Sequence, residues 1–272
     1  MSLARQHFQK HSAIAAAVSA AEFGTMQEQT FYELQLAQLN NDRHRLKQIQ
    51  STEAKIQLKK SLLPTYLPYV DGIIEANKTI QDSVFMTLLV WCIDIENYEK
   101  AIEMAEFALR HNMLMPDRFE RKTATLVTEE IANTFLKQLK TNADVDIAVL
   151  LQLENLVIRS DIEHSDIDLK VLDMPDQVKA KLYVALGKAK IKQIQDKDDP
   201  NDTDIATAQD AQNYLEHAIK LDDKCGGKQD LKTVETLLKK FPPPQAKQAE
   251  PLLNTNGSQV VDDQGDLQFK TT

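Results

Sequence analysis

The 272-residue chain has little of what a sheet, a disulfide framework or a membrane span requires. It has only seven glycines and 6% aromatic residues, whereas Ala, Leu, Gln, Lys and Glu are plentiful, a balance that favours helices over strands. Its two cysteines, Cys92 and Cys225, are too few for a disulfide framework. No charged-then-apolar leader precedes the Ala-rich start, and no apolar run reaches the roughly 18 to 20 residues of a membrane span. We expect a helical intracellular protein that is not secreted and has no membrane partner.

Charge is distributed unevenly along the chain. The formal net charge of −9 by itself disfavours a nucleic-acid partner. The first 60 residues, however, carry eight Lys/Arg and five Asp/Glu, whereas each later part of the chain is acidic. The start of the chain is therefore its one basic region. For binding nucleic acid, the distribution of charge along the chain matters more than the net charge.

The sequence predicts one long helix near the start. Thr25 and Glu28 have the spacing of a capping box, and neither Gly nor Pro follows before Leu63. A narrow apolar stripe at coiled-coil spacing calls for a partner helix, which is either another subunit or the body of the same one. We expect Pro64 to end this helix and Pro68 to open the next. The stripe consists of Leu39, Leu46, Ile49, Ile56 and Leu63.

Two helical hairpins are predicted downstream. The first spans residues 71–111 with a break near Asn97, and small residues at positions 101, 105 and 108 line one helix face, as in tetratricopeptide-like units. The second spans residues 176–221, with Pro175 as a first-turn residue and an acidic loop between its helices. A buried helix follows Asp144 or Asp146, and a last helix covers residues 228–240. The predicted fold is all-α, with a basic helical arm (1–63), a helical-hairpin body (64–240) and a slightly acidic, disordered tail (241–272).

No catalytic constellation is recognisable in the sequence. A hydrolytic nuclease needs carboxylates or histidines that converge on a metal ion. Asp94, Glu96 and Glu99 cluster at a helix junction without a paired His or Lys, and His7 with His11 forms only half of a metal site. No Gly-rich phosphate loop is present, so ATP hydrolysis would require a partner. We therefore predict no metal site and no cofactor, with Mg²⁺ needed only if the chain itself cleaves DNA.

Two basic groups are candidates for contact with DNA phosphates. Neutralising phosphates releases counterions and supplies affinity that does not depend on base sequence. The alternative for both groups is an ordinary solvated surface, and oligomerisation would multiply either patch. The first group, in the predicted long helix, is Arg43, Arg45, Lys47, Lys55, Lys59 and Lys60. The second, in a predicted loop, is Arg118, Arg121 and Lys122.

The stretch from residue 62 to 132 resembles the small terminase subunit, also called the terminase endonuclease subunit, of P-two-like temperate tailed phages and prophages. A second match begins at Asp173, and the resemblance covers about residues 26–240. It is carried by Leu63-Pro64, Leu67-Pro68, Gly72, Gln81-Asp82, Trp91, Asp94, the alanines at 101, 105 and 108, Met115-Pro116, Arg118 and Glu129-Glu130.

The resemblance implies a role in viral DNA packaging in the cytoplasm of a bacterial host. Such a protein would bind concatemeric double-stranded DNA near the cohesive-end site and present it to a large terminase subunit with ATPase activity. It also implies a homo-oligomer, ring-like or otherwise. Two alternatives stay open at this point: a metal-dependent endonuclease that uses Asp94 and its neighbours, and a helical-repeat adaptor between proteins with no DNA role.

Overall fold

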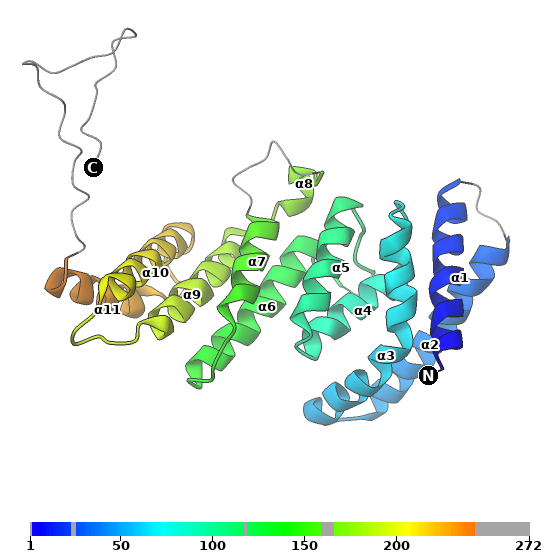
Figure 1. Ribbon diagram of the computed structural model, residues 1–272, viewed down its shortest axis with the longest axis horizontal. Coiled ribbons are helices and arrows are strands. Elements are labelled where there is room, and N and C mark those ends of the chain that lie inside the picture. Colours follow the sequence, from blue (N-terminus) through cyan, green and yellow to red (C-terminus); the bar gives the residue numbers. More distant parts are fainter. Residues whose placement is uncertain (1, 23–25, 117–118, 159–165, 243–272) are drawn as a thin grey trace, which may run out of the picture.

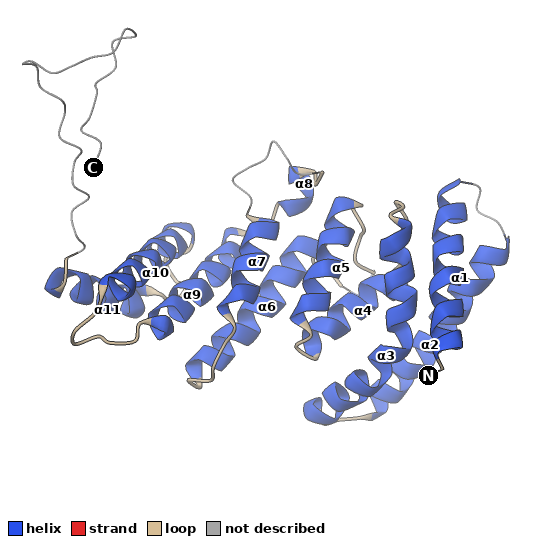
Figure 2. Cartoon of the chain, viewed as in Figure 1, coloured by secondary structure: helices blue, strands red, loops and turns tan. Residues whose placement is uncertain are grey.

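The computed structural model describes residues 2–22, 26–116, 119–158 and 166–242. In these parts the chain forms eleven helices and no strand, which confirms the predicted all-α class (Figure 2). The predicted tail, apart from residues 241 and 242, and the predicted cap Thr25 lie outside the described residues. The helices are α1 (Leu3–Glu22), α2 (Met26–Gln48), α3 (Thr52–Ala76), α4 (Ser83–Asp94), α5 (Tyr98–Arg110), α6 (Thr123–Lys140), α7 (Ile147–Val157), α8 (Leu169–Leu172), α9 (Asp176–Gln193), α10 (Asp202–Leu221) and α11 (Lys228–Lys240).

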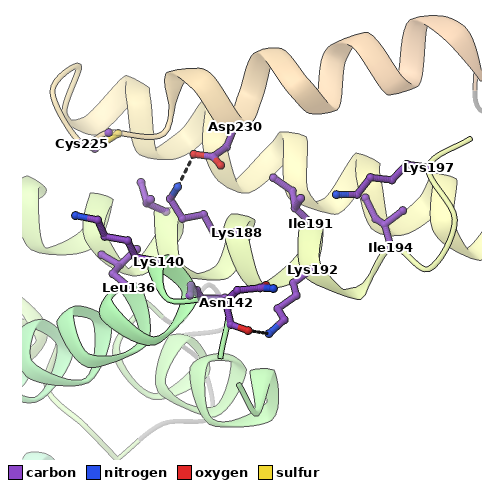
Figure 3. Close-up of a pocket in the computed structure, with 13 residues that line it drawn as sticks. Leu136, Lys140, Asn142, Lys188, Ile191, Lys192, Ile194, Lys197, Cys225 and Asp230 are labelled. Atoms are coloured by element: carbon purple, nitrogen blue, oxygen red, sulfur yellow. Dashed lines mark hydrogen bonds and ion pairs between the residues drawn. The ribbon is translucent and has the colours of Figure 1, made fainter. Parts of the chain in front are cut away.

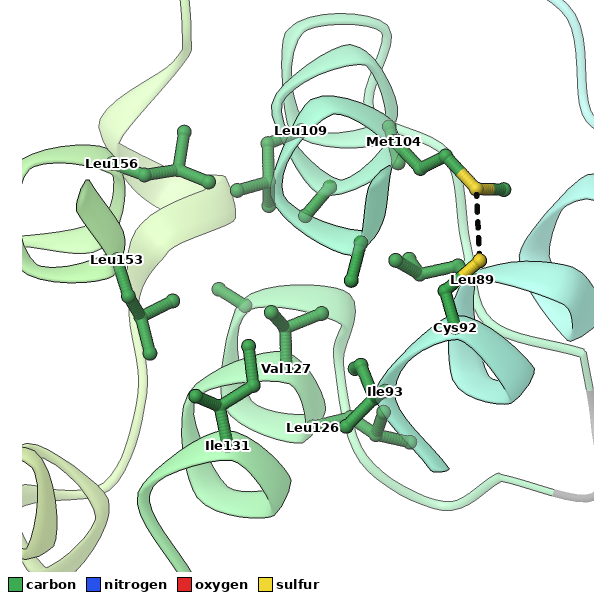
Figure 4. Close-up of a cluster of buried hydrophobic side chains, with 14 of the residues drawn as sticks. Leu89, Cys92, Ile93, Met104, Leu109, Leu126, Val127, Ile131, Leu153 and Leu156 are labelled. Atoms are coloured by element: carbon green, nitrogen blue, oxygen red, sulfur yellow. Dashed lines mark hydrogen bonds between the residues drawn. The ribbon is translucent and has the colours of Figure 1, made fainter. Parts of the chain in front are cut away.

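The helices follow one another along the long axis of the molecule, from α1–α3 at one end to α9–α11 at the other (Figure 1). Each packs chiefly against its neighbours, as α4 does on α5, α6 on α9 and α9 on α10. One continuous apolar core joins α1 to α10, and a smaller cluster joins α9 and α10 to α11. Figure 4 shows the middle of the main core, where side chains from α4, α5, α6 and α7 meet.

Both predicted hairpins are present. Helices α4 and α5 form the first, and the side chain of Asn97 caps α5 by accepting a hydrogen bond from the Lys100 N–H at 3.5 Å. The small residues on α5 are completely buried, so they permit close helix packing. Helices α9 and α10 form the second hairpin, where Ala211, Leu215 and Ala218 are also fully buried. The tetratricopeptide-like character of these units stays a prediction.

The later helices also agree with the sequence. Asp146, one of the two expected caps, accepts a hydrogen bond from the Ala148 N–H at the start of α7 at 3.0 Å. The last helix has the predicted bounds, Lys228–Lys240. Pro175 immediately precedes α9 instead of lying within its first turn.

The prediction of one long helix through Leu63 was wrong. Helix α2 ends at Gln48, and α3 begins at Thr52. The break has a local cause, because Ser51 adopts an extended backbone and its hydroxyl accepts a hydrogen bond from the Ala54 N–H at 3.3 Å. The apolar stripe packs within its own chain, since Leu39, Leu46 and Leu63 are all part of the core.

The expected roles of the two prolines were also wrong, because α3 continues through Pro64 and Pro68. An interior proline costs about 3 kcal/mol in a helix. Packing offsets this cost here: Leu63, Tyr66 and Tyr69 are buried around the prolines. The proposed boundary between arm and body at residues 63 and 64 therefore falls inside one continuous helix.

Candidate nucleic-acid interface

The first basic group lies at one end of the α2–α3 hairpin, beside the short turn that joins the two helices (Figure 1). We call its six residues the basic tip. They are Arg43, Arg45 and Lys47 in the last turns of α2, and Lys55, Lys59 and Lys60 in the first turns of α3. Between residues 43 and 60 the only acidic side chain is Glu53. The reversal of the chain thus gathers the cations at one corner instead of spreading them along a single rod.

A buried carboxylate supports the basic tip from behind. Asp42 is only 5% exposed, and it accepts a hydrogen bond from the Tyr66 hydroxyl on α3 at 2.8 Å. Its other oxygen pairs with Arg45 at 2.8 Å. Burial, followed by the hydrogen bond to Asp42, raises the pKa of Tyr66, so the phenol keeps its proton. Asp42 therefore fixes α2 to α3 and orients one arginine of the tip.

The other cations of the tip differ in their partners. Arg43 donates a hydrogen bond to the neutral amide of Asn40 at 3.2 Å. Lys59 is paired with Asp94 on α4. Within the described part of the chain, no acidic side chain pairs with Lys47, Lys55 or Lys60. These three lysines and Arg43 hold charge that is not neutralised inside the protein and is available to an anionic ligand.

The second basic group has a different environment. Arg118 lies outside the described residues. Arg121 forms two ion pairs of 2.7 Å, with Glu129 and Glu130 on α6, and Lys181 of α9 also pairs with Glu129 at 2.6 Å. These cations lower the pKa of Glu129, with Lys181 the largest cause. Arg121 thus ties the loop to α6, and Glu129 in turn links α6 to α9.

Lys122, the last member of the second group, lies 3.7 Å from Asp173. Both side chains are largely exposed, and ion pairs of this kind contribute little to stability. The two described members of the second group, Arg121 and Lys122, are thus each paired with an acidic side chain and do not form an unpaired basic surface.

Two acidic side chains of the predicted cluster at the end of α4 bond to polar side chains of the protein. Asp94 pairs with Lys59, and Glu96 accepts a hydrogen bond from the Gln138 side chain at 3.2 Å. Among the described residues, no three His, Cys, Asp or Glu side chains lie together as a metal site would require. The Nε2 atoms of His7 and His11 are 3.0 Å apart on α1.

Several residues that carry the family resemblance hold the fold together. Asp82 is fully buried, caps α4 through the Phe85 N–H at 2.8 Å and accepts a hydrogen bond from Tyr69. Burial raises the pKa of both side chains. A Cβ at Gly72 would lie 2.5 Å from the Lys10 carbonyl oxygen, so only glycine lets α1 approach α3 this closely.

Trp91 and Gln81, which also carry the resemblance, have structural roles as well. Trp91 is 4% exposed and lies edge-on to Tyr66, so it belongs to the core. The amide of Gln81 bonds both the N–H and the C=O of Leu114 at 2.8 Å, and so fastens the α3–α4 connection to the segment after α5.

A second basic surface, which the sequence does not reveal, lies at the other end of the molecule. A cleft of about 770 Å³ lies between the ends of α6 and α9 and the start of α11 (Figure 3). Four lysines from two helices and a loop line it: Lys140, Lys188, Lys192 and Lys197. They are scattered over nearly 60 positions in the chain, so no local pattern revealed them.

Comparisons with known proteins give one consistent result. The model of the phage small terminase subunit family matches residues 36–165. A terminase endonuclease subunit of Escherichia phage P2 is 32% identical over 246 residues, which cover 90% of this chain and 89% of that protein. A probable terminase endonuclease subunit of Haemophilus phage HP1 is 25% identical over 96 residues, or 35% of this chain and 34% of that one. No solved structure matches the chain.

Within the described segments, no helix combines the length and apolar character that crossing a bilayer requires.

Proposed function

The chain belongs to the phage small terminase subunit family, and from this premise we propose that it binds concatemeric viral DNA near the cohesive-end site during packaging. In this proposal it acts in the cytoplasm of the bacterial host. It presents the DNA to a large terminase subunit that hydrolyses ATP. The observation that carries the DNA-binding step is the basic tip, with its three lysines that lack acidic partners among the described residues.

The geometry of the tip supports contact with the phosphate backbone. Its cations lie at two helix ends at one corner, and Glu53 is the only acidic residue between positions 43 and 60, so a duplex that approaches this corner meets mainly cations. Lysine binds phosphate as a mobile point charge, whereas Arg43 adds a planar donor. Such contacts position a protein on DNA and give affinity that depends on salt.

The test compares DNA binding by the full chain with that of the variant Lys47→Ala/Lys55→Ala/Lys60→Ala. Removing three phosphate contacts should weaken binding and reduce the slope of log affinity against log salt by about 2 to 3. The matched control is Lys137→Ala/Lys170→Ala/Lys232→Ala, which removes the same charge from α6, α8 and α11. Equal losses from both variants would show that net charge alone governs binding. Unchanged affinity in the first variant would remove the tip from the proposal and favour an adaptor without a DNA role.

A second candidate function is DNA cleavage by this chain itself. It is favoured by the name of the 32% identical relative, a terminase endonuclease subunit. Hydrolysis of a phosphodiester would need Mg²⁺ or a similar ion to activate water and stabilise the leaving oxygen. The purified chain, incubated with Mg²⁺ or Mn²⁺ and cohesive-end DNA, tests this function directly. Cleavage that appears only after the large subunit is added would assign the cutting to the complex or to the partner.

We also propose that the protein works as a homo-oligomer, which would present several basic tips to one duplex. Support comes from α1, where Leu3 and Phe8 are 83% and 66% exposed. Large apolar side chains at the end of a helical array are suited to contact with a second copy. Light scattering of the wild type and of Leu3→Ser/Phe8→Ser tests this. A lower mass for the variant supports contact through α1, and an unchanged oligomer excludes it.

A further inference from the structure

The lysine-lined cleft at the α6–α9–α11 junction combines two kinds of surface. Its lining is partly aliphatic and partly basic, with Asp230 as the one acidic lining residue (Figure 3). The aliphatic lining residues, which we call the aliphatic floor, are Leu136, Leu139, Val184, Ile191 and Ile194. This combination suits a ligand that has both apolar and anionic groups.

Two of the four lysines are tied to the protein. Lys188 pairs with Asp230 at 2.5 Å, and Lys192 pairs with Asp144 at 3.0 Å while donating to the Asn142 carbonyl oxygen at 3.0 Å. The other two, Lys140 and Lys197, are exposed and have no acidic partner in the described part of the chain. The cleft therefore keeps an excess of positive charge beside an apolar floor.

A phosphate group would use only half of this surface, because the aliphatic floor would stay in contact with water. A peptide with apolar and acidic side chains would use both halves: burial of its apolar groups contributes about 25 cal/mol per Å². Its carboxylates would meet Lys140 and Lys197, the two lysines without an acidic partner in the described part of the chain.

The chain itself contains a segment of this chemistry. Between residues 251 and 269 the only charged side chains are Asp262, Asp263 and Asp266. They are flanked by Val260, Val261, Leu267 and Phe269 in the stretch VVDDQGDLQF. We propose that the cleft is a peptide-docking site and that its occupant is this C-terminal segment, residues 260–269, of the same chain.

The chain is long enough for this contact. The cleft lies at the start of α11, where Asp230 and Gly226 line it, whereas the C-terminal segment follows the other end of that helix. The segment must therefore return over about 20 Å, the length of a 13-residue helix. Val260 lies 20 positions after Lys240, and a chain of this length can span up to about 65 Å. An intramolecular connection of this kind gives an effective concentration in the millimolar range, so modest intrinsic affinity suffices.

Cys225 offers a direct reporter, because it lines the cleft and is partly exposed. The other cysteine, Cys92, is fully buried, and burial raises its pKa to about 12, so it should not react in the folded protein. The measurement is the rate at which the uncharged reagent N-ethylmaleimide modifies Cys225 in the full chain. A neutral reagent avoids direct attraction to the lysines.

We expect the tail variant Asp262→Lys/Asp263→Lys to release the segment and raise the rate about three- to tenfold. The cleft variant Lys140→Glu/Lys197→Glu should do the same, although added negative charge near a thiol by itself slows its reaction. A variant with both pairs of charge reversals should again be modified slowly, because the charges of the segment and the cleft are complementary again. Leu267→Ser/Phe269→Ser should raise the rate through loss of the apolar contact.

The outcomes separate the possible occupants. Slow modification that is independent of protein concentration supports docking within one chain. Protection that disappears on dilution would assign the segment to the cleft of a second copy and overturn the intramolecular proposal. If neither charge reversal changes the rate of Cys225 modification but added DNA duplex lowers it, the cleft would be a phosphate site. Rates unaffected by the tail variants, with or without DNA, would also refute the proposal.

Discussion

The hydroxyl of Tyr66 donates a hydrogen bond to the buried carboxylate of Asp42 across 2.8 Å, and this pair joins α3 to α2 behind the basic tip. Asp42 also holds Arg45. Tyr66→Phe leaves the ring against Trp91 but removes the donor, and a hydrogen bond to a charged group contributes about 1.5 to 3 kcal/mol. We expect the free energy of unfolding to fall by about that amount in urea titrations. A loss no larger than a few tenths of a kcal/mol would show that water replaces the phenol.

Gly72→Ala should loosen α1 from α3. The new methyl group would lie 2.5 Å from the Lys10 carbonyl oxygen and 2.7 Å from the Ala13 methyl, so one helix must shift. Overpacking of this kind costs about 1 to 3 kcal/mol. Hydrogen exchange should become faster in α1 and stay unchanged in α9 and α10. Uniformly faster exchange would indicate global destabilisation instead.

Stability should fall in acid partly because of Glu129. Lys181 and Arg121 lower the pKa of this carboxyl below its usual 4.5 in the folded chain. Because the folded pKa is the lower one, the stabilisation is present above 4.5 and is lost as the pH falls through the folded value. The difference in unfolding free energy between the wild type and Glu129→Gln should therefore be largest near neutral pH and shrink below pH 4.5. A constant difference would contradict this assignment.

The two cysteines should differ in reactivity. Cys92 is completely buried beside Met104, and its raised pKa of about 12 keeps it protonated at neutral and mildly alkaline pH. Cys225 is partly exposed. Mass spectrometry of the native protein after alkylation should find the label on Cys225 and not on Cys92, whereas unfolding in urea should expose both. Early labelling of Cys92 would show that the α4–α5 pair opens locally.

The sequence predicted most of the body because its signals are local. Small residues at positions 101, 105 and 108 indicated a close helix contact, and Asp146 and Asn97 are helix caps of ordinary type. The wrong predictions at the N-terminal end arise from long-range contacts. Pro64 and Pro68 are tolerated because distant parts of the chain bury the residues around them, and a local rule cannot anticipate that.

The candidate site was predictable only in part. The sequence predicts the six residues of the basic tip as one charged group, but it does not predict the turn at Ser51 that gathers them. The charge of Arg121 makes it a candidate for DNA contact, whereas its partners Glu129 and Glu130 lie eight and nine positions away. The lysine cleft combines side chains from α6, α9 and the loop after it, and such a surface exists only once the helices have packed.

Pro64 and Pro68 lack the N–H groups that would bond the carbonyls of Lys60 and Pro64, so two successive turns of α3 each lack one backbone hydrogen bond. These bonds give a helix its resistance to bending. The first turns of α3, with Lys55 and Lys59, are therefore joined to the rest of the helix through its most compliant section. In the proposed complex with DNA, this section is where α3 would bend first if a duplex met the basic tip at an imperfect angle.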